Sequence, residues 1–371
     1  MLRSPLALAL VAATLAASSA CSIRPRKKHT VTAVASASAS ARAVTSAQPF
    51  DLDAGVVDAG AADAGALDGG ADAGPDDDPM ALHLETKEEL LALFTIDKRK
   101  KDGALFLEKT FDVGSARRTN QGNKELAHHA ISRAKCLAGL AGVTLQTPEQ
   151  RRVCGADDMV PIYRHGDPKK TKACIDVFEF PNKPCELPFV WIAPLQAERM
   201  CELEGKRLCQ QEEWMLACRG DPDGGKDRVF AYGDEMDLDI CNTNKPAAKF
   251  GPGCDPDSAA SAWKTCATNT EPSGAFPECK SRFGVYDQHG NVAEIMTRRD
   301  VEDGKLYSQL KGSAFFYVDV ARKPNEKQEK GHETYPDMCN HDPRWHVEPM
   351  DEAWHVNYHL GFRCCKTVRR P

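Results

Sequence analysis

A loop in the last third of the chain carries the side chains best suited to hold a metal ion. Asp287 and Glu294 supply carboxylates at its two ends, and Gly290 and Val292 supply backbone carbonyls between them. Calcium prefers hard oxygen ligands on a loop bent by glycine. We therefore predict a calcium site made of these four residues. The alternative is a loop held by hydrogen bonds alone, with Glu294 capping backbone amides.

The late part of the chain also holds histidines, whose imidazole nitrogens suit iron and copper. His355 and His359 are four residues apart and would share one face of a helix. Val356, Tyr358 and the Gly361-Phe362 pair nevertheless favour an extended segment. We interpret these histidines as surface or hydrogen-bonded residues and keep a redox-metal site as the alternative. The candidates are His332, His341, His346, His355 and His359.

Fifteen cysteines indicate an oxidising compartment. Cys21 stands apart near the N-terminus, and the other fourteen form an even set that predicts a disulfide framework. Zinc is the alternative, but the sequence has no C-x-x-C pair. Cys364 and Cys365 are adjacent, which suits two separate disulfides better than one metal ion.

Residues 1–21 are typical of an export signal. An apolar run over residues 6–17 follows Arg3, and small residues lead to Cys21. Such a run is too short to span a bilayer and is typical of a secretory signal. The arrangement resembles a bacterial lipobox, so we predict lipidation of Cys21; cleavage near Ala20 with a plain thiol is the alternative. Ser22 in the second mature position suggests, by resemblance to bacterial sorting rules, the outer membrane of the cell envelope.

Residues 22–80 are predicted to form a disordered linker. An Ala/Ser-rich part is followed by repeated Asp-Ala-Gly triplets, with no residue beyond Phe50 that could anchor a core. Few apolar side chains and mutually repelling aspartates favour an extended tether. Residues 1–80 hold six basic and nine acidic residues, which leaves the remainder with a formal charge of −3. A mixed, nearly neutral surface gives no footprint for nucleic-acid binding.

Two regions with different patterns follow the linker. Residues 81–158 are predicted to form a small helical lead, with a capping box at Thr86-Lys87-Glu88-Glu89, a helix over 124–140 and a short helix from Thr147-Pro148. Cys136 and Cys154 could join the last two of these helices. Residues 159–371 mix short strands over 159–162 and 174–180 with helices over 194–205 and 210–218. Long loops then run to Phe283, and loops of that length are usually functional or pinned by bridges and ions.

Four motifs of this second region, in order, resemble those of the formylglycine-generating enzyme (sulfatase-modifying factor) family. The first runs from Gly205-Lys206-Arg207-Leu208 to Glu213-Trp214 and on to Ala217-Cys218-Arg219-Gly220; the second is Phe283 to Glu294. Lys311-Gly312-Ser313 and Gly361-Phe362-Arg363-Cys364 complete the set. The resemblance covers about 210 residues. It implies an α+β, C-type-lectin-like fold that is poor in regular structure and rich in ordered loops and disulfides.

The resemblance also implies roles for individual residues. Disulfides are expected between Cys201 and Cys364 and between Cys218 and Cys339. The calcium ligands carry over as Asp287 and Glu294 by side chain and Gly290 and Val292 by carbonyl. A second calcium site of the family begins at an asparagine that Asn242 matches.

The chain departs from the family at its catalytic positions. Formylglycine-generating oxidases hold copper with two cysteines, and soft thiolates suit Cu(I). The matching positions here are Phe316 and Ala321, neither of which can ligate a metal. Ala293 replaces the tryptophan before the calcium-binding glutamate, and Ser313 remains. We therefore expect no peptide-cysteine oxidation by the family's mechanism.

The sequence supports two functions. The first is a lipid-anchored envelope protein whose family domain is braced by calcium and serves binding or envelope structure, with the membrane and a protein, peptide or glycan as partners. Trp345 and Trp354 would stack on such a ligand or pack in the core. The second is an oxygen-dependent iron or copper enzyme built on the late histidines.

Overall fold

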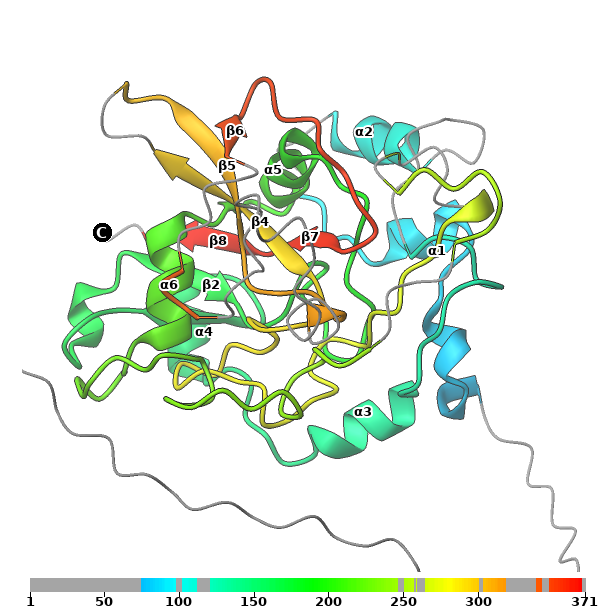
Figure 1. The fold of residues 1–371 in the computed structure, drawn as a ribbon. Coiled ribbons are helices and arrows are strands. Elements are labelled where there is room, and N and C mark those ends of the chain that lie inside the picture. Colours follow the sequence, from blue (N-terminus) through cyan, green and yellow to red (C-terminus); the bar gives the residue numbers. More distant parts are fainter. Residues whose placement is uncertain are drawn as a thin grey trace, which may run out of the picture. The chain divides into compact units, whose positions relative to one another are not determined.

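The fold is described here from a computed structural model (Figure 1). It describes residues 75–97, 102–111, 121–245, 250–256, 258, 264–299, 303–317, 338–341 and 347–368. The predicted export signal with Cys21 and nearly all of the predicted linker lie outside the described residues. So do four of the residues singled out above: Ala321, His332, Trp345 and His346.

Short helices make up the lead region. They are α1 (Lys87–Ala92), α2 (Gly103–Thr110), α3 (Arg133–Gly139) and α4 (Pro148–Cys154). The 3-10 helices η1 (Pro75–Asp77) and η2 (Pro79–Leu82) come before them, so the predicted disordered linker is wrong in its last residues. The predicted capping box occurs at the start of α1, with Thr86 and Glu89. The helix predicted from Thr147-Pro148 is α4, and Thr147 and Gln150 form a second capping box there.

The helix predicted over 124–140 is wrong in its first half. Only Arg133–Gly139 is helical, and Ser132 caps its start. The backbone N–H groups of Ala130 and Ile131 donate to the carboxylate of Glu271, 2.9 and 3.0 Å away. These tertiary hydrogen bonds replace the helical ones, because each N–H has one proton to donate.

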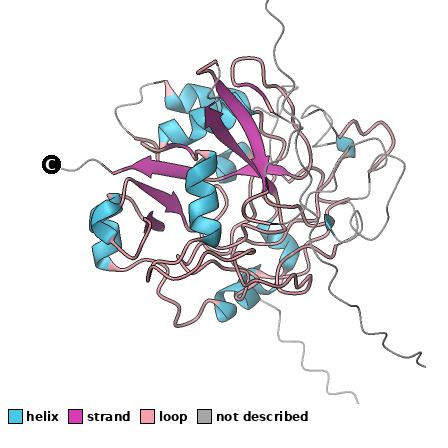
Figure 2. Cartoon of the chain, turned by 60° about the vertical axis from the view of Figure 1, so that its left-hand side comes forward, coloured by secondary structure: helices cyan, strands magenta, loops and turns pink. Residues whose placement is uncertain are grey.

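Two four-stranded sheets form the framework of the second region (Figures 1 and 2). The first has the order β1 (Met159–Ile162), β2 (Ala173–Asp176), β8 (Cys364–Thr367) and β3 (Arg207–Leu208), all antiparallel. The second has the order β6 (Glu348–Pro349), β5 (Leu306–Lys311), β4 (Ala293–Arg299) and β7 (Leu360–Phe362). There β4 and β7 run parallel, with Glu294 opposite Gly361.

The remaining elements are η3 (Pro168–Lys170), α5 (Pro194–Leu203) and α6 (Gln211–Arg219). Trp214 of α6 packs in one core cluster with Ile175 of β2 and Met296 of β4. The described residues between α6 and β4 are almost entirely irregular, with helical backbone only at residues 264–265. The predicted α+β class with little regular structure is confirmed.

The lead region packs into the core of the second region. Leu90, Leu107 and Phe111 lie fully buried in one cluster with Phe180 and Phe189. A polar contact adds to this packing. His83 and His129 lie 3.1 Å apart through ring nitrogens and also contact the backbone oxygens of Gly122 and Thr270.

Seven disulfides join all fourteen described cysteines. Cys201 is bonded to Cys364 and Cys218 to Cys339, as the resemblance implied. The expected Cys136–Cys154 bridge is wrong. Cys136 of α3 bonds Cys185, and Cys154 of α4 bonds Cys174 on β2, so each helix is tied to the second region and not to the other helix. The other pairs are Cys209–Cys365, Cys241–Cys279 and Cys254–Cys266.

These bridges can be checked by a peptide map of the unreduced protein. We expect one peptide joining Cys136 to Cys185 and another joining Cys154 to Cys174; a peptide joining Cys136 to Cys154 would contradict the fold. Replacing Cys136 and Cys185 with alanine opens a loop of 49 residues and should cost about 4 kcal/mol of unfolding free energy. The control opens the Cys254–Cys266 loop of 12 residues, for which about 3 kcal/mol is expected.

Candidate functional site

The loop from Asp287 to Glu294 is curled by residues in the left-handed backbone region. Asp287, Gly290 and Asn291 have φ values of 56°, 73° and 57°. Aspartate and asparagine tolerate this region better than most residues, and glycine adopts it freely. Gly290 also has no room for a side chain, because a Cβ there would lie 2.3 Å from the backbone oxygen of Asn242.

The loop is held by hydrogen bonds to Glu179, which the sequence analysis did not single out. Its carboxylate accepts hydrogen bonds from Val292 N–H at 3.1 Å, Asn291 Nδ2 at 2.6 Å and Ser273 Oγ at 3.1 Å. Glu179 is fully buried. The signal in the sequence is a lone acid inside the apolar run Val177-Phe178-Glu179-Phe180, because such a carboxylate needs polar partners from elsewhere in the fold.

Glu294 forms a buried ion pair with Arg363. The Nε of Arg363 donates to Glu294 Oε2 at 2.6 Å, and the Nε1 of Trp214 donates to the same oxygen at 2.8 Å. Both charged side chains are almost completely buried. Arg363 also donates through Nη2 to the backbone oxygen of Tyr286 at 2.8 Å, beside Asp287.

Asp287 and Glu179 are electrostatically coupled to this pair. Burial raises the pKa of Asp287 to about 7, against the opposing effects of the Gly274 N–H group and Arg363. Burial, followed by the charges of Asp287 and Glu294, holds the pKa of Glu179 well above its usual range. One guanidinium thus faces three carboxylates in this set, so ionising all three leaves an excess of buried negative charge.

The donor chemistry of the loop fits a calcium ion. Calcium takes hard oxygen ligands, and a divalent cation would offset the excess of buried carboxylate charge. Glu179, Asp287 and Glu294 do not bring three ligand atoms within 4.8 Å of one another, so an ion here would also need the carbonyl oxygens of Gly290 and Val292. Both oxygens of Glu294 already accept hydrogen bonds, from Arg363 and Trp214, so the ion would share this carboxylate with the guanidinium.

Asn242 lies against the same loop. Its backbone oxygen accepts the Asn291 N–H at 2.8 Å, and its Nδ2 donates to Asn291 Oδ1 at 2.9 Å. The structure therefore places Asn242 beside the predicted calcium loop, where it supports Gly290 and Asn291.

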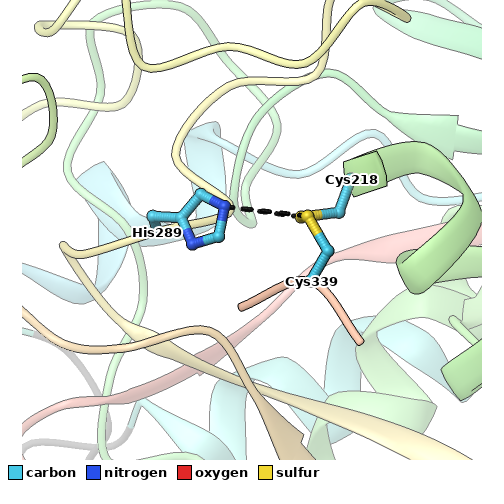
Figure 3. A group of neighbouring side chains, drawn as sticks. All are labelled: Cys218, His289 and Cys339. Carbon is cyan, nitrogen blue, oxygen red and sulfur yellow. Dashed lines mark hydrogen bonds between the residues drawn. A yellow bond between two sulfur atoms is a disulfide. The ribbon is translucent and has the colours of Figure 1, made fainter. Parts of the chain in front are cut away.

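One side-chain group among the described residues has the compactness of a transition-metal site: Cys218, His289 and Cys339 (Figure 3). The two sulfurs, however, form a disulfide. His289 Nε2 lies 3.4 Å from the Cys218 sulfur and accepts the Ala231 N–H at 2.9 Å. The sulfurs are not thiolates, and the ring nitrogen already accepts a hydrogen bond. The oxidised group therefore packs in the core and offers no set of metal ligands.

Phe316, which the sequence analysis matched to a copper-binding cysteine, lies in an aromatic cluster. The ring of Phe316 lies 5.2 Å from Phe315, 5.6 Å from Tyr358 and 5.1 Å from His359, measured between centroids. Ser313 is fully buried and accepts the Gly290 N–H at 2.9 Å, so it supports the predicted calcium loop.

The described late histidines do not form a common site. His341, His355 and His359 belong to no set of three metal-ligating side chains in the described part of the chain. None of them lies in a helix. The prediction of an extended segment holds only for β7, because Tyr358 and His359 form a turn before it.

Comparison with known proteins agrees with the motifs. Residues 156–368 match the model of the sulfatase-modifying factor enzyme 1-like domain. Two curated relatives, from Mus musculus and Bos taurus, are both called "Inactive C-alpha-formylglycine-generating enzyme 2". They are 28% and 27% identical over 186 residues, which is 50% of this chain and 51% or 52% of the relative. The chain thus spans about half the length of the curated relatives it matches.

A solved structure, described as "Crystal Structure of CarF", aligns with 57% of this chain and 97% of its own, at 13% identity and a TM-score of 0.34. That likeness is too weak to bear on function. The family model, by contrast, covers more than half of the chain. The chain therefore belongs to the sulfatase-modifying factor enzyme 1-like family.

Proposed function

We propose that this protein is a non-catalytic member of its family, a calcium-braced module that serves binding or structure in the bacterial cell envelope. The observation that carries the proposal is the oxidation of the cysteines: all fourteen described cysteines are in disulfides. A family oxidase needs a pair of thiols for copper. Phe316 occupies one matching position, within an aromatic cluster, and Ala321 is the residue at the other.

The two curated relatives support the same conclusion, since the name of both includes the word inactive. They cover only part of this chain, so the support extends to the family domain. Loss of catalysis leaves a rigid base that presents ordered loops, which suits recognition.

Calcium would brace the domain at the loop from Asp287 to Glu294. Asp287 and Glu294 would hold the ion by side chain, and Gly290 and Val292 by carbonyl oxygen. When bound, calcium supplies charge neutralisation and fixed coordination. The residues of the protein do the rest: Glu179 orients the loop, and Arg363 joins it to the C-terminal strands.

The envelope location rests on the sequence of the N-terminal region, with Cys21 as the lipidated residue and an outer-membrane position. No helix among the described residues has both the length and the apolar character needed to cross a membrane. Trp354 is 62% exposed, and such an aromatic surface is suited to stack on a peptide or glycan ligand.

The alternative is an oxygen-dependent iron or copper enzyme that uses the late histidines. Metal analysis of the purified protein separates the two functions. We expect calcium near one per chain and no stoichiometric iron or copper, with a fall in melting temperature after treatment with EGTA and recovery when calcium, but not magnesium, is returned. Iron or copper near one per chain would overturn the proposal, and His355→Ala with His359→Ala would then test those ligands.

The pKa of Asp287 gives a sharper test of the calcium site. In EGTA, native Asp287 keeps a proton up to about pH 7, whereas the unfolded residue loses it near pH 4. Unfolding free energy should therefore fall as pH rises from about 4 to 7, by up to about 1.4 kcal/mol per pH unit from this residue. Calcium binding, which needs the ionised form, should strengthen over the same interval.

The stability difference between the variant Asp287→Asn and the wild type should depend on calcium. In EGTA at pH 8 it should be more stable than the wild type, because it buries no ionised acid. In calcium it should gain less stability than the wild type does. The control is Asp303→Asn, which alters an exposed acid before β5. If calcium stabilised the wild type and Asp287→Asn equally, Asp287 would not be a calcium ligand.

Catalysis can be tested directly. The protein, supplied with Cu(I), oxygen and a cysteine-containing peptide, should form no formylglycine and should consume oxygen no faster than free copper does. A catalytically active family member serves as the positive control under the same conditions. Peptide aldehyde formed at a rate above that background would contradict the proposal.

A further inference from the structure

A polar pocket lies between the lead region and the second region, apart from the copper-matching position. Its volume is about 450 Å³. Its walls come from residues 143–145 after α3, from the segment that contains Arg228 and Tyr232, and from the loop over 278–286. Two of these three segments belong to the irregular region between α6 and β4.

The charged residues of the pocket are mostly basic. Arg228, Lys280 and Arg282 line it, against the single acid Glu278. Arg282 is neutralised by an ion pair with Asp221. Arg228 donates through Nη1 to a backbone oxygen, and neither Arg228 nor Lys280 has a carboxylate within 4.0 Å among the described residues. Two basic side chains therefore remain available for an anion.

A buried hydroxyl without a partner belongs to a residue in the wall of the pocket. Tyr286 lines it, is 1% exposed and stacks on Phe178 with ring centroids 5.3 Å apart. Its hydroxyl is buried and has no hydrogen-bond partner among the described residues. A buried hydroxyl in a native protein is normally hydrogen-bonded, so this one indicates a group that the protein alone does not supply.

We propose that this pocket binds a small organic oxyanion, a molecule with a carboxylate, sulfate or phosphate group. Arg228 and Lys280 supply the positive charge, and the Tyr286 hydroxyl donates a hydrogen bond that fixes the orientation of the anion. Val143 and Leu145 provide an apolar wall for the rest of the molecule. This site rests on neither calcium nor the absence of catalysis.

Tyr286→Phe is the decisive variant, because it removes only the hydroxyl. Removing a buried donor without a partner should leave the melting temperature unchanged or raise it. Binding should nevertheless weaken by roughly tenfold, the usual effect of losing a hydrogen bond to a charged group. The probes are benzoate, inorganic sulfate and inorganic phosphate, titrated calorimetrically into the purified full-length protein, in calcium and again in EGTA. Binding in both solutions separates this site from the calcium loop.

Charge variants complete the test. Lys280→Gln should also weaken binding by roughly tenfold, whereas Lys366→Gln, which alters a lysine of a different surface pocket, should leave it unchanged. Preference for benzoate identifies a carboxylate ligand with an apolar body, and preference for sulfate or phosphate identifies a tetrahedral oxyanion. Absence of saturable binding for all three probes overturns the proposal. Equal losses in Lys280→Gln and Lys366→Gln, or a destabilised Tyr286→Phe that binds as well as wild type, also overturn it.

Discussion

Burial of the Arg363 guanidinium is the constraint on which the rest of the structure depends. A charge removed from water must be paired and hydrogen-bonded, or the fold loses several kcal/mol. Arg363 meets this need by contacting Glu294 on β4, the backbone oxygens of Asp176 and Val177 at the end of β2, and that of Tyr286. One side chain thus joins both sheets to the start of the Asp287–Glu294 loop.

The same constraint explains why the loop is rich in acids and yet tightly held. Glu294 is paired with Arg363. Glu179 accepts hydrogen bonds from the Asn291 side chain and the Val292 backbone of the loop. Asp287, whose pKa is raised to about 7, is the acid whose ionisation depends most on what is bound nearby.

Local signals allowed part of the fold to be predicted. Capping boxes at Thr86 and Thr147 act within one turn, and α1 and α4 begin where these residues predict. The segment before Ser132 has helical spacing of apolar residues but gives its N–H groups to Glu271, about 140 residues away. The residues of the candidate site also fall into those predictable from a local motif and those that depend on distant contacts. The Asp287–Glu294 loop is visible as a motif, whereas Glu179 depends on contacts with Asn291 and Val292 more than 110 residues distant.

The disulfide framework also determines how the molecule would carry tension. The Cys136–Cys185 and Cys201–Cys364 bridges span sequence separations of 49 and 163 residues. A pull between Cys136 and the C-terminus would pass across these bonds, so the residues inside each loop would bear no load while the sulfurs stay joined. Even full unfolding would extend mainly the short segment from Cys185 to Cys201. In a protein pulled from its N-terminus, shear would extend the residues before Cys136, whereas most of the family domain is covalently protected from stretching.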